Sequence, residues 1–268
     1  MYLFVSPHYD DAVYSCGGTL HQLSRQGVPV MVVTTMGGFP DKVPITPITE
    51  GLHQRWQAGE NPVRTRRAED AEALGRLGTK AKHVLEVPDC VYRTNPRTDE
   101  PLYPTEDSLW KHIHPDDWAA SWLRTRYFTL DKAVLAQSTR MYAPLAAGAH
   151  VDHLLVRDVA LALLPQLQEW NIELWLYADY PYIEDATALT EAIASLPSDL
   201  HITKTYTMLT ADDVDAKIDA VKDYRSQIST FWQSESMLEE RIQAALTADT
   251  NMPTESYYQI SQPSQTTN

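Results

Sequence analysis

Two short segments carry most of the residues that could do chemistry. SPHYDD (6–11) supplies His8, Asp10 and Asp11, and GAHVDH (148–153) supplies two further histidines and an aspartate. Imidazole nitrogens and carboxylate oxygens are typical zinc ligands, and they often act as general acids and bases. Taken alone, each segment is equally typical of a turn that caps a helix.

The position of both segments favours a functional reading. Each follows a short apolar run that is typical of a buried strand, and the carboxyl ends of parallel strands form one edge where ligands bind. We therefore expect His150, Asp152 and His153 to face the first segment. Two imidazoles and a carboxylate make an open catalytic zinc site with one position for water, and the remaining residues would then assist the reaction.

The surrounding elements alternate between apolar strands and helices. Strands are predicted at residues 2–5, 28–35, 82–88, 140–145 and 172–179, with an edge strand at 202–209. Helices are predicted at 16–26, 64–78, 117–137, 152–167, 211–226 and 236–246, and long loops at 36–64 and 89–115. This order predicts an α/β, Rossmann-like fold: a mostly parallel sheet with helices on both faces and C-terminal additions.

Length and composition predict one large domain at residues 1–248, because a chain of 268 residues can bury a substantial core. Residues 249–268 contain no Lys or Arg and many Ser, Thr and Gln, so we expect a polar C-terminal tail that is partly disordered. The two cysteines, Cys16 and Cys90, lie far apart and form no disulfide framework. We expect Cys16, which precedes a glycine pair, to be a small buried residue.

The net charge of the chain excludes some classes of binding partner. A formal net charge of −14 argues against nucleic acid and against an anionic membrane surface. No GxGxxG or Walker A pattern is present. No signal peptide precedes the first strand and no run approaches 18 apolar residues, so we expect a cytoplasmic protein without a membrane span.

The two segments together resemble the motifs of the PIG-L/LmbE-like zinc-dependent N-deacetylases, which are usually (A/S)HPDDE and HxDH. RRAEDAEALGRLG and YADYPY are similar to further stretches of that family, and the resemblance extends over residues 1–185. It implies that His8, Asp11 and His153 hold Zn²⁺, although Fe²⁺ suits the same ligands.

The resemblance also implies roles for the other residues. Asp10 would be the general base that activates a zinc-bound water. His150, as an imidazolium, would stabilise the oxyanion and later protonate the departing amine, and Asp152 would orient one of the histidines. The implied reaction removes an acyl group, above all acetyl, from the nitrogen of an N-acetylglucosamine-type sugar or its conjugate.

The chain departs from the family pattern at three points. Tyr9 replaces the usual proline, Ala12 replaces a glutamate that is not a ligand, and the second motif lacks a nearby tyrosine that some members use. All the implied metal ligands remain, so we expect an active enzyme.

Further residues have both a functional and a structural interpretation. Arg67, Tyr177 and Asp179 are predicted substrate contacts, whereas arginines at 64, 66 and 67 could instead pair with acidic neighbours. The aromatic residues Trp110, Trp118 and Trp122 could stack on a sugar, but their spacing on a helix is more typical of core packing.

HIHPDD (112–117) spells the first motif more literally than SPHYDD does. It has no buried strand before it and no glycine pair after it, so we expect Asp116 and Asp117 to cap the following helix.

Two other functions stay open at this point. One is another single-metal hydrolase, since phosphoesterases often need two bridged metals. The other is a non-catalytic sugar- or metal-binding relative. The predicted partner is a small-molecule sugar or glycoconjugate, and the sequence leaves the aglycone, the acyl length and any homo-oligomer open.

Overall fold

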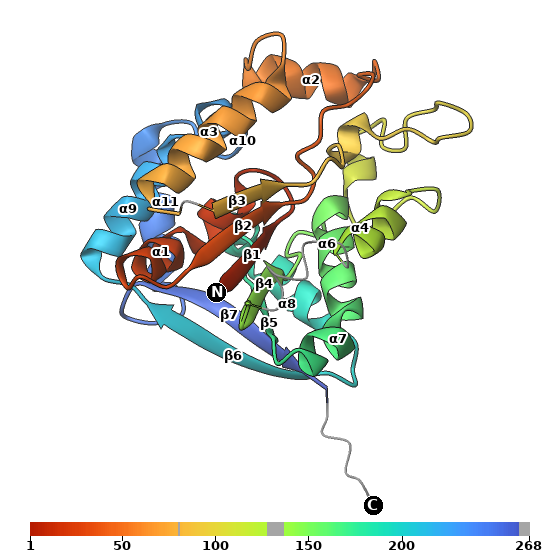
Figure 1. Cartoon of the computed structure of the whole chain (residues 1–268). Coiled ribbons are helices and arrows are strands. Elements are labelled where there is room, and N and C mark those ends of the chain that lie inside the picture. Colours follow the sequence, from red (N-terminus) through yellow and green to blue (C-terminus); the bar gives the residue numbers. More distant parts are fainter. Residues whose placement is uncertain (80, 128–136, 263–268) are drawn as a thin grey trace, which may run out of the picture.

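A seven-stranded sheet forms the centre of the computed structural model, which describes residues 1–79, 81–127 and 137–262. The strand order is β3-β2-β1-β4-β5-β7-β6, with β1 to β5 parallel and β7 antiparallel to both of its neighbours (Figure 1). The strands are β1 Tyr2–Ser6, β2 Val30–Thr34, β3 Ala81–Val84, β4 Arg140–Pro144, β5 Glu173–Tyr177, β6 His201–Met208 and β7 Thr254–Ser261. The predicted α/β fold is confirmed, and β6 lies at the edge as expected.

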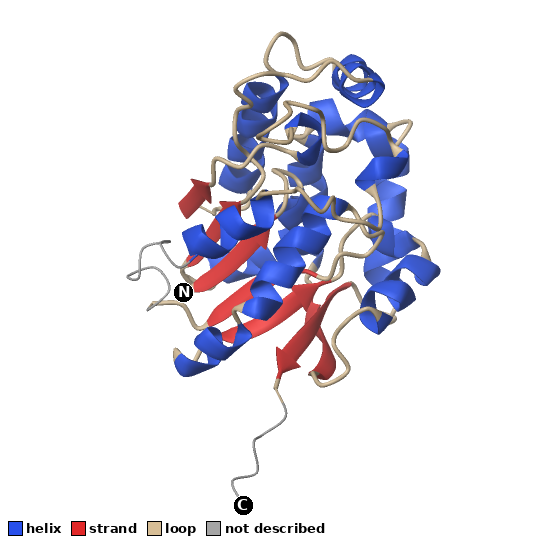
Figure 2. Ribbon diagram, turned by 90° about the vertical axis from the view of Figure 1, so that its right-hand side faces the viewer, coloured by secondary structure: helices blue, strands red, loops and turns tan. Residues whose placement is uncertain are grey.

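Helices cover both faces of the sheet (Figure 2). They are α1 Asp11–Arg25, α2 Pro47–Trp56, α3 Pro62–Arg76, α4 Ala119–Tyr127, α6 Val151–Ala162, α7 Leu164–Glu169, α8 Ala186–Ala194, α9 Ala211–Lys222, α10 Arg225–Phe231 and α11 Glu235–Thr247. Within β1, Phe4 joins a core with Leu20 of α1, whereas Leu3 and Val5 join a second core with Val156 of α6.

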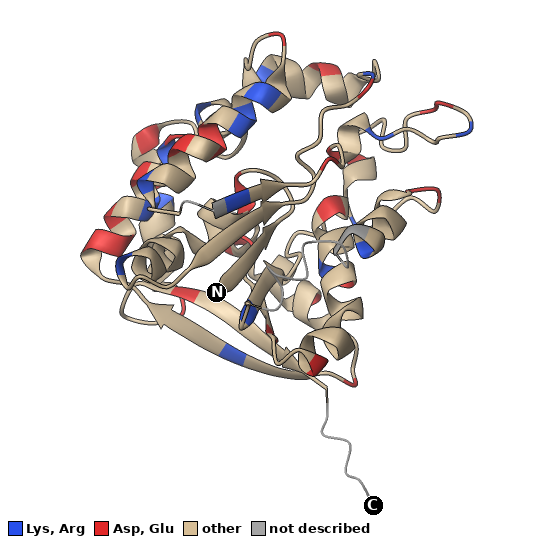
Figure 3. Cartoon of the chain, viewed as in Figure 1, with Lys and Arg blue, Asp and Glu red and all other residues tan. Residues whose placement is uncertain are grey.

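The strands carry far fewer charged residues than the helices and loops, as expected for a sheet covered on both faces (Figure 3). In the described part of the chain, no helix has the length and apolar character needed to cross a bilayer. Cys16 is fully buried in the core on the α1 side, which confirms its predicted packing role.

The topology brings the two sequence motifs together. The chain runs from β1 outward to β2 and β3, and then returns to place β4 on the other side of β1. A crevice opens where the strand order reverses in this way, beyond the carboxyl ends of the strands. The first motif links β1 to α1 and the second links β4 to α6, so both border this crevice.

The predicted loop at 36–64 contains a helix that was not expected from the sequence. Thr46 and Thr49 form a reciprocal capping box at the start of α2, and Pro47 occupies its first position. The capping box and the first-turn proline are helix-start signals that can be read from the sequence. The many glycines and prolines of this segment instead favoured the prediction of a loop.

The C-terminal segment also differs from the expectation. Residues 254–261 form β7, inside the sheet between β5 and β6, so the predicted tail supplies a strand of the domain. Within β7, the side chain of Glu255 is buried, and its burial is stabilised by hydrogen bonds that it accepts from Gly18 N (2.9 Å), Thr19 N (2.8 Å) and Lys217 Nζ (2.7 Å). Residues 263–268 lie outside the described residues.

Three predicted helices have different ends in the structure. The prediction at 117–137 corresponds to α4 up to Tyr127, and residues 128–136 lie outside the described residues. The prediction at 152–167 divides into α6 and α7, where Pro165 falls within the first turn of α7. The prediction at 211–226 divides into α9 and α10.

Asp70 on α3 makes the stability of this fold depend on pH. The side chain is buried and accepts a hydrogen bond from Tyr224 Oη (3.0 Å). Burial raises the pKa of Asp70 from 3.8 to about 7, although Tyr224 opposes the shift. A carboxyl whose folded-state pKa is raised contributes stability below its unfolded pKa and loses that contribution as the pH rises through the folded value.

We expect Asp70→Asn, which keeps an oxygen for Tyr224, to remove this dependence. From pH 5 to pH 8 the unfolding free energy of the wild type should fall by about 2–3 kcal/mol relative to the variant, at about 1.4 kcal/mol per pKa unit. Urea unfolding at both pH values measures the difference, with exposed Asp219→Asn as the control. Parallel pH profiles for wild type and Asp70→Asn would contradict the assignment.

Candidate metal centre and active site

The turn between β1 and α1 is held by its own hydrogen bonds. Ser6 Oγ donates to His8 O (2.5 Å) and accepts from Ala12 N (2.9 Å). His8 N donates to Asp11 Oδ2 (2.7 Å). These bonds fix the backbone from the last residue of β1 to the first turn of α1, so His8 and Asp11 are presented together at the sheet edge.

The second motif begins α6. His150 is the N-cap residue, and its Nδ1 accepts a hydrogen bond from Asp152 N (3.3 Å). Gly148 precedes it with a φ of 79°, and a Cβ there would lie 2.7 Å from the Tyr182 ring. Glycine at 148 therefore allows both the left-handed backbone and the close approach of Tyr182.

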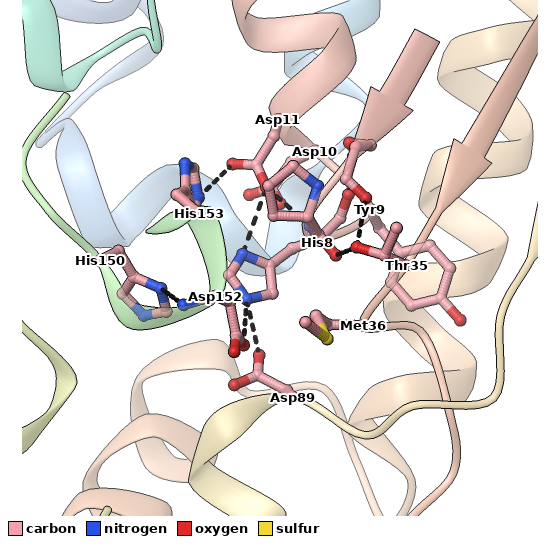
Figure 4. A network of polar contacts seen from close by, with 12 residues as sticks. His8, Tyr9, Asp10, Asp11, Thr35, Met36, Asp89, His150, Asp152 and His153 are labelled. Atoms are coloured by element: carbon pink, nitrogen blue, oxygen red, sulfur yellow. Dashed lines mark hydrogen bonds and ion pairs between the residues drawn. The ribbon is translucent and has the colours of Figure 1, made fainter. Parts of the chain in front are cut away.

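The three predicted metal ligands converge at Asp11. Asp11 Oδ2 lies 3.2 Å from His8 Nδ1, and Asp11 Oδ1 lies 3.3 Å from His153 Nε2 (Figure 4). Ligand atoms that share a tetrahedral zinc at about 2.0–2.2 Å lie about 3.3–3.6 Å from one another. The two measured separations therefore suit a single small cation.

His153 Nε2 is poised to act as a ligand. This buried atom has no hydrogen-bond partner among the described residues. The other ring nitrogen, Nδ1, donates to Asp179 Oδ1 (2.8 Å), so Nε2 is the nitrogen that faces Asp11 and that a metal would bind in place of a proton. A carboxylate behind a metal-binding imidazole fixes its tautomer in this way.

The charge balance around these ligands also favours a cation. Two buried arginines, Arg66 and Arg93, accompany five buried carboxylates, which are Asp10, Asp11, Asp89, Asp152 and Asp179. Burial opposes ionisation, yet His153 and His8 hold the pKa of Asp11 well below its usual range. Burial lowers the pKa of His153, but Asp11 and Asp179 outweigh it and raise the value to about 9. The raised pKa values of His8 and His153 show that these carboxylates favour positive charge at the two imidazoles, and a divalent cation would take the place of those protons.

Asp10 lies beside the centre and is held by an arginine. It is buried, makes no capping hydrogen bond, and accepts from Arg66 Nη2 (3.2 Å). Burial raises its pKa, with Arg66 acting in the opposite direction. A buried carboxylate with a raised pKa is suited to accept a proton during a reaction.

The surroundings of His150 favour a neutral imidazole, whereas the resemblance implied an imidazolium. Burial, together with the neighbouring His8, lowers its pKa to about 3. Because Nδ1 already accepts a hydrogen bond from Asp152 N, the proton of the neutral ring belongs on Nε2. His150 can therefore donate one hydrogen bond from Nε2 without carrying a charge.

Other sets of potential ligands lie close by. Nitrogen atoms of His8, His150 and His153 lie within 4.8 Å of one another, and a second set combines His8 with Asp89 and Asp152. A third set, Cys90, His150 and Asp152, contains none of the three predicted ligands.

Two predicted substrate contacts are buried in the structure. Tyr177 is fully buried and its hydroxyl donates to Val5 O (2.9 Å). Asp179, 1% exposed, accepts from Ala147 N (3.1 Å) as well as from His153. Their polar atoms are therefore engaged within the protein, and Asp179 supports His153.

Of the two adjacent arginines on α3, Arg66 rather than the predicted Arg67 contacts the carboxylates of the site. The Arg67 guanidinium lies 6.0 Å from the Phe39 ring centroid, whereas Arg66 reaches Asp10 and Asp89 Oδ2 (3.3 Å). Arg66 shares the buried face of α3 with Asp70, four positions later. That helical phase is a sequence signal that could have identified Arg66.

Aromatic side chains border the centre on one side. The Trp110 ring lies 5.2 Å from the His150 ring, and Tyr182 lies 5.5 Å from His153. Tyr182 and Phe231 also line a cavity of about 500 Å³. Trp110, in the predicted loop, packs partly buried against one core, and Trp118 and Trp122 pack against the other, in line with the core-packing interpretation.

Several known proteins are similar to this chain in sequence and in fold. The family model "PIG-L: GlcNAc-PI de-N-acetylase" matches residues 3–164. A 2'-N-acetylparomamine deacetylase from Niallia circulans is 31% identical over 192 residues, which cover 68% of this chain and 67% of that protein. The solved structure of a teicoplanin deacetylase in a zinc-inhibited form superposes with a TM-score of 0.83 at 25% identity, over 99% of both chains. The A40926 pseudoaglycone deacetylase gives a TM-score of 0.75 at 25% identity, over 97% of both chains.

These matches agree with the chemistry that the geometry allows, because the motifs that define the site lie within the matched residues. The chain belongs to the PIG-L family of de-N-acetylases and is a metal-dependent deacetylase, an enzyme that hydrolyses N-acetyl groups.

Proposed function

We propose that the enzyme removes an N-acetyl group from an amino sugar within a glycoconjugate, with Zn²⁺ held by His8, Asp11 and His153. The observation that carries this proposal is the placement of Asp11 between two histidine nitrogens, at 3.2 and 3.3 Å, with the separate carboxylate of Asp10 beside it. The relatives, which include a 2'-N-acetylparomamine deacetylase and a teicoplanin deacetylase, support a sugar-bearing substrate.

Zinc in such a site acts as a Lewis acid that makes water more acidic and polarises an acyl carbonyl. Asp10 then accepts the proton of the attacking water. Its buried position and raised pKa make the protonated form accessible, and Arg66 keeps the side chain in place. The same proton can pass from Asp10 to the departing amine nitrogen.

His150 stabilises the negative charge that develops on the acyl oxygen. It donates from Nε2 as a neutral imidazole, because Nδ1 is engaged with Asp152 N. A neutral imidazole is a poor proton source for an amine, since losing Nε2–H would leave an anion. We therefore assign the return of the proton to Asp10 and the electrostatic contribution to His150.

The aromatic border of the centre suits a sugar. Trp110 offers an apolar face next to His150, and the cavity lined by Tyr182, Phe231 and Trp232 is large enough for a further part of a glycoconjugate. Pockets that combine aromatic walls with a few polar groups are typical of small-ligand sites.

Metal-dependent release of acetate is the direct test. The metal-free enzyme and the enzyme resupplied with Zn²⁺ or Fe²⁺ would be offered N-acetylglucosamine, diacetylchitobiose and 2'-N-acetylparomamine. We expect amine, detected with fluorescamine, to appear together with acetate only in the metal-loaded enzyme, with one zinc bound per chain. Zinc binding without acetate release from any of these probes would favour a binding protein over an enzyme of this specificity.

A further inference from the structure

Arg93 lies entirely inside the protein, behind the metal centre. Its side chain is 0% exposed, and its guanidinium lies 5.4 Å from the Tyr103 ring centroid. Nη2 donates to Asp152 Oδ1 (2.5 Å) and to Asp117 Oδ2 (2.9 Å), and Nη1 donates to Pro88 O (3.1 Å). Two buried carboxylates therefore share one cationic side chain.

Asp117 is itself fixed by its neighbours. Its Oδ2 also accepts from Tyr103 Oη (2.7 Å), and its Oδ1 accepts from Ala119 N at the start of α4 (2.9 Å). Asp117 comes from HIHPDD, the segment expected only to cap this helix. It does cap the helix, and it also anchors Arg93.

Asp152 connects this arginine to a predicted metal ligand. Asp152 Oδ2 lies 3.0 Å from His8 Nε2 and also accepts from Cys90 N (3.0 Å). With Nε2 engaged by Asp152, the other ring nitrogen, His8 Nδ1, faces Asp11. The contacts thus run without interruption from Asp117 through Arg93 and Asp152 to His8.

We propose that Arg93, anchored by Asp117, is a positioning residue that orients His8 for metal binding through Asp152. This inference rests on the proposed function, because it concerns the same zinc site. The planar guanidinium bridges two carboxylates at fixed angles, which a flexible ammonium group does not do. Loss of the bridge would release Asp152, and with it the orientation of the His8 ring.

Arg93→Lys keeps the charge but loses the rigid guanidinium, whose Nη2 holds both carboxylates while Nη1 is tied to Pro88 O. We expect its zinc dissociation constant, measured by chelator competition, to rise by about 10-fold or more, in the range for residues behind metal ligands. Arg76→Lys is the control, because Arg76 likewise pairs with a buried carboxylate, that of Asp223, at 2.7 and 3.0 Å, but lies outside the metal centre. The control should leave zinc affinity unchanged, whatever it does to the melting temperature.

Asp117→Asn is the second variant, and it tests the same positioning role even if Arg93→Lys fails to fold. An asparagine can offer its single oxygen to Ala119 N or to Arg93 and Tyr103, but not to both sides. We expect weaker zinc binding, whereas exposed Asp116→Asn, whose carboxylate contacts only Asn95 (3.0 Å) in the described structure, should bind zinc like the wild type.

The outcomes separate this inference from the proposed function. Zinc affinity equal to the wild type in folded Arg93→Lys or Asp117→Asn overturns the positioning role, even if stability falls. Weaker zinc binding in both variants at near-normal melting temperature supports it. Failure of the wild type to bind zinc would instead overturn the proposed function itself.

Discussion

Asp10→Asn is expected to lower kcat by about 10²–10⁴-fold, the usual contribution of a general base, while the enzyme keeps its zinc. Asparagine has nearly the same shape and can still accept from Arg66 with its oxygen, but it cannot take a proton from water. Initial rates of acetate release, together with zinc content, measure the two effects separately.

The KM of this variant should change little, because Asp10 acts on the attacking water rather than on the sugar. Activity at the wild-type level would refute the assignment of Asp10 as the base. Loss of zinc from Asp10→Asn would show instead that this carboxylate belongs to the metal centre.

Asp11→Asn makes the same chemical change one residue later, and we expect a different result. Asp11 places one oxygen against His8 and the other against His153, so its neutral amide would remove a metal ligand. Zinc affinity should fall by more than about 100-fold, since residues behind the ligands alone account for about 10–100-fold. Activity should fall to background at equimolar zinc.

The comparison with Asp10→Asn controls for the loss of a buried charge in the same turn. Melting temperatures of both variants in chelator report whether Asp11→Asn still folds, because asparagine can keep the bond from His8 N. Retained zinc at wild-type affinity in Asp11→Asn would exclude Asp11 as a ligand.

The sequence alone determined where the reactive residues lie along the chain and which elements carry them. Strand ends and helix starts are local features, so the residue pattern is enough to place SPHYDD after β1 and GAHVDH after β4. The parallel alternation then required both to reach the same edge. The meeting of the two motifs is predictable for this reason, whereas the choice of His8, Asp11 and His153 among their residues came from the resemblance to the family.

Only the tertiary structure decided which partners surround these residues. Arg93 was not distinguishable from a surface arginine, and the helical phase of Arg66 could mark it as buried but could not name its partners, because the carboxylates that both residues bind come from distant segments. The same holds for Glu255, whose buried partners lie on the distant helices α1 and α9. These partners allow a strand with a polar sequence to join the sheet.

The charge of His150 also required the fold. An isolated histidine titrates near neutrality, and the neutral state here follows from burial beside His8 together with a backbone hydrogen bond. Tyr177 and Asp179 likewise sit at a strand end, as predicted, but their polar atoms are buried against Val5 and His153. Local pattern fixes the position of a residue in the chain, whereas packing between distant segments sets its burial, its partners and its protonation.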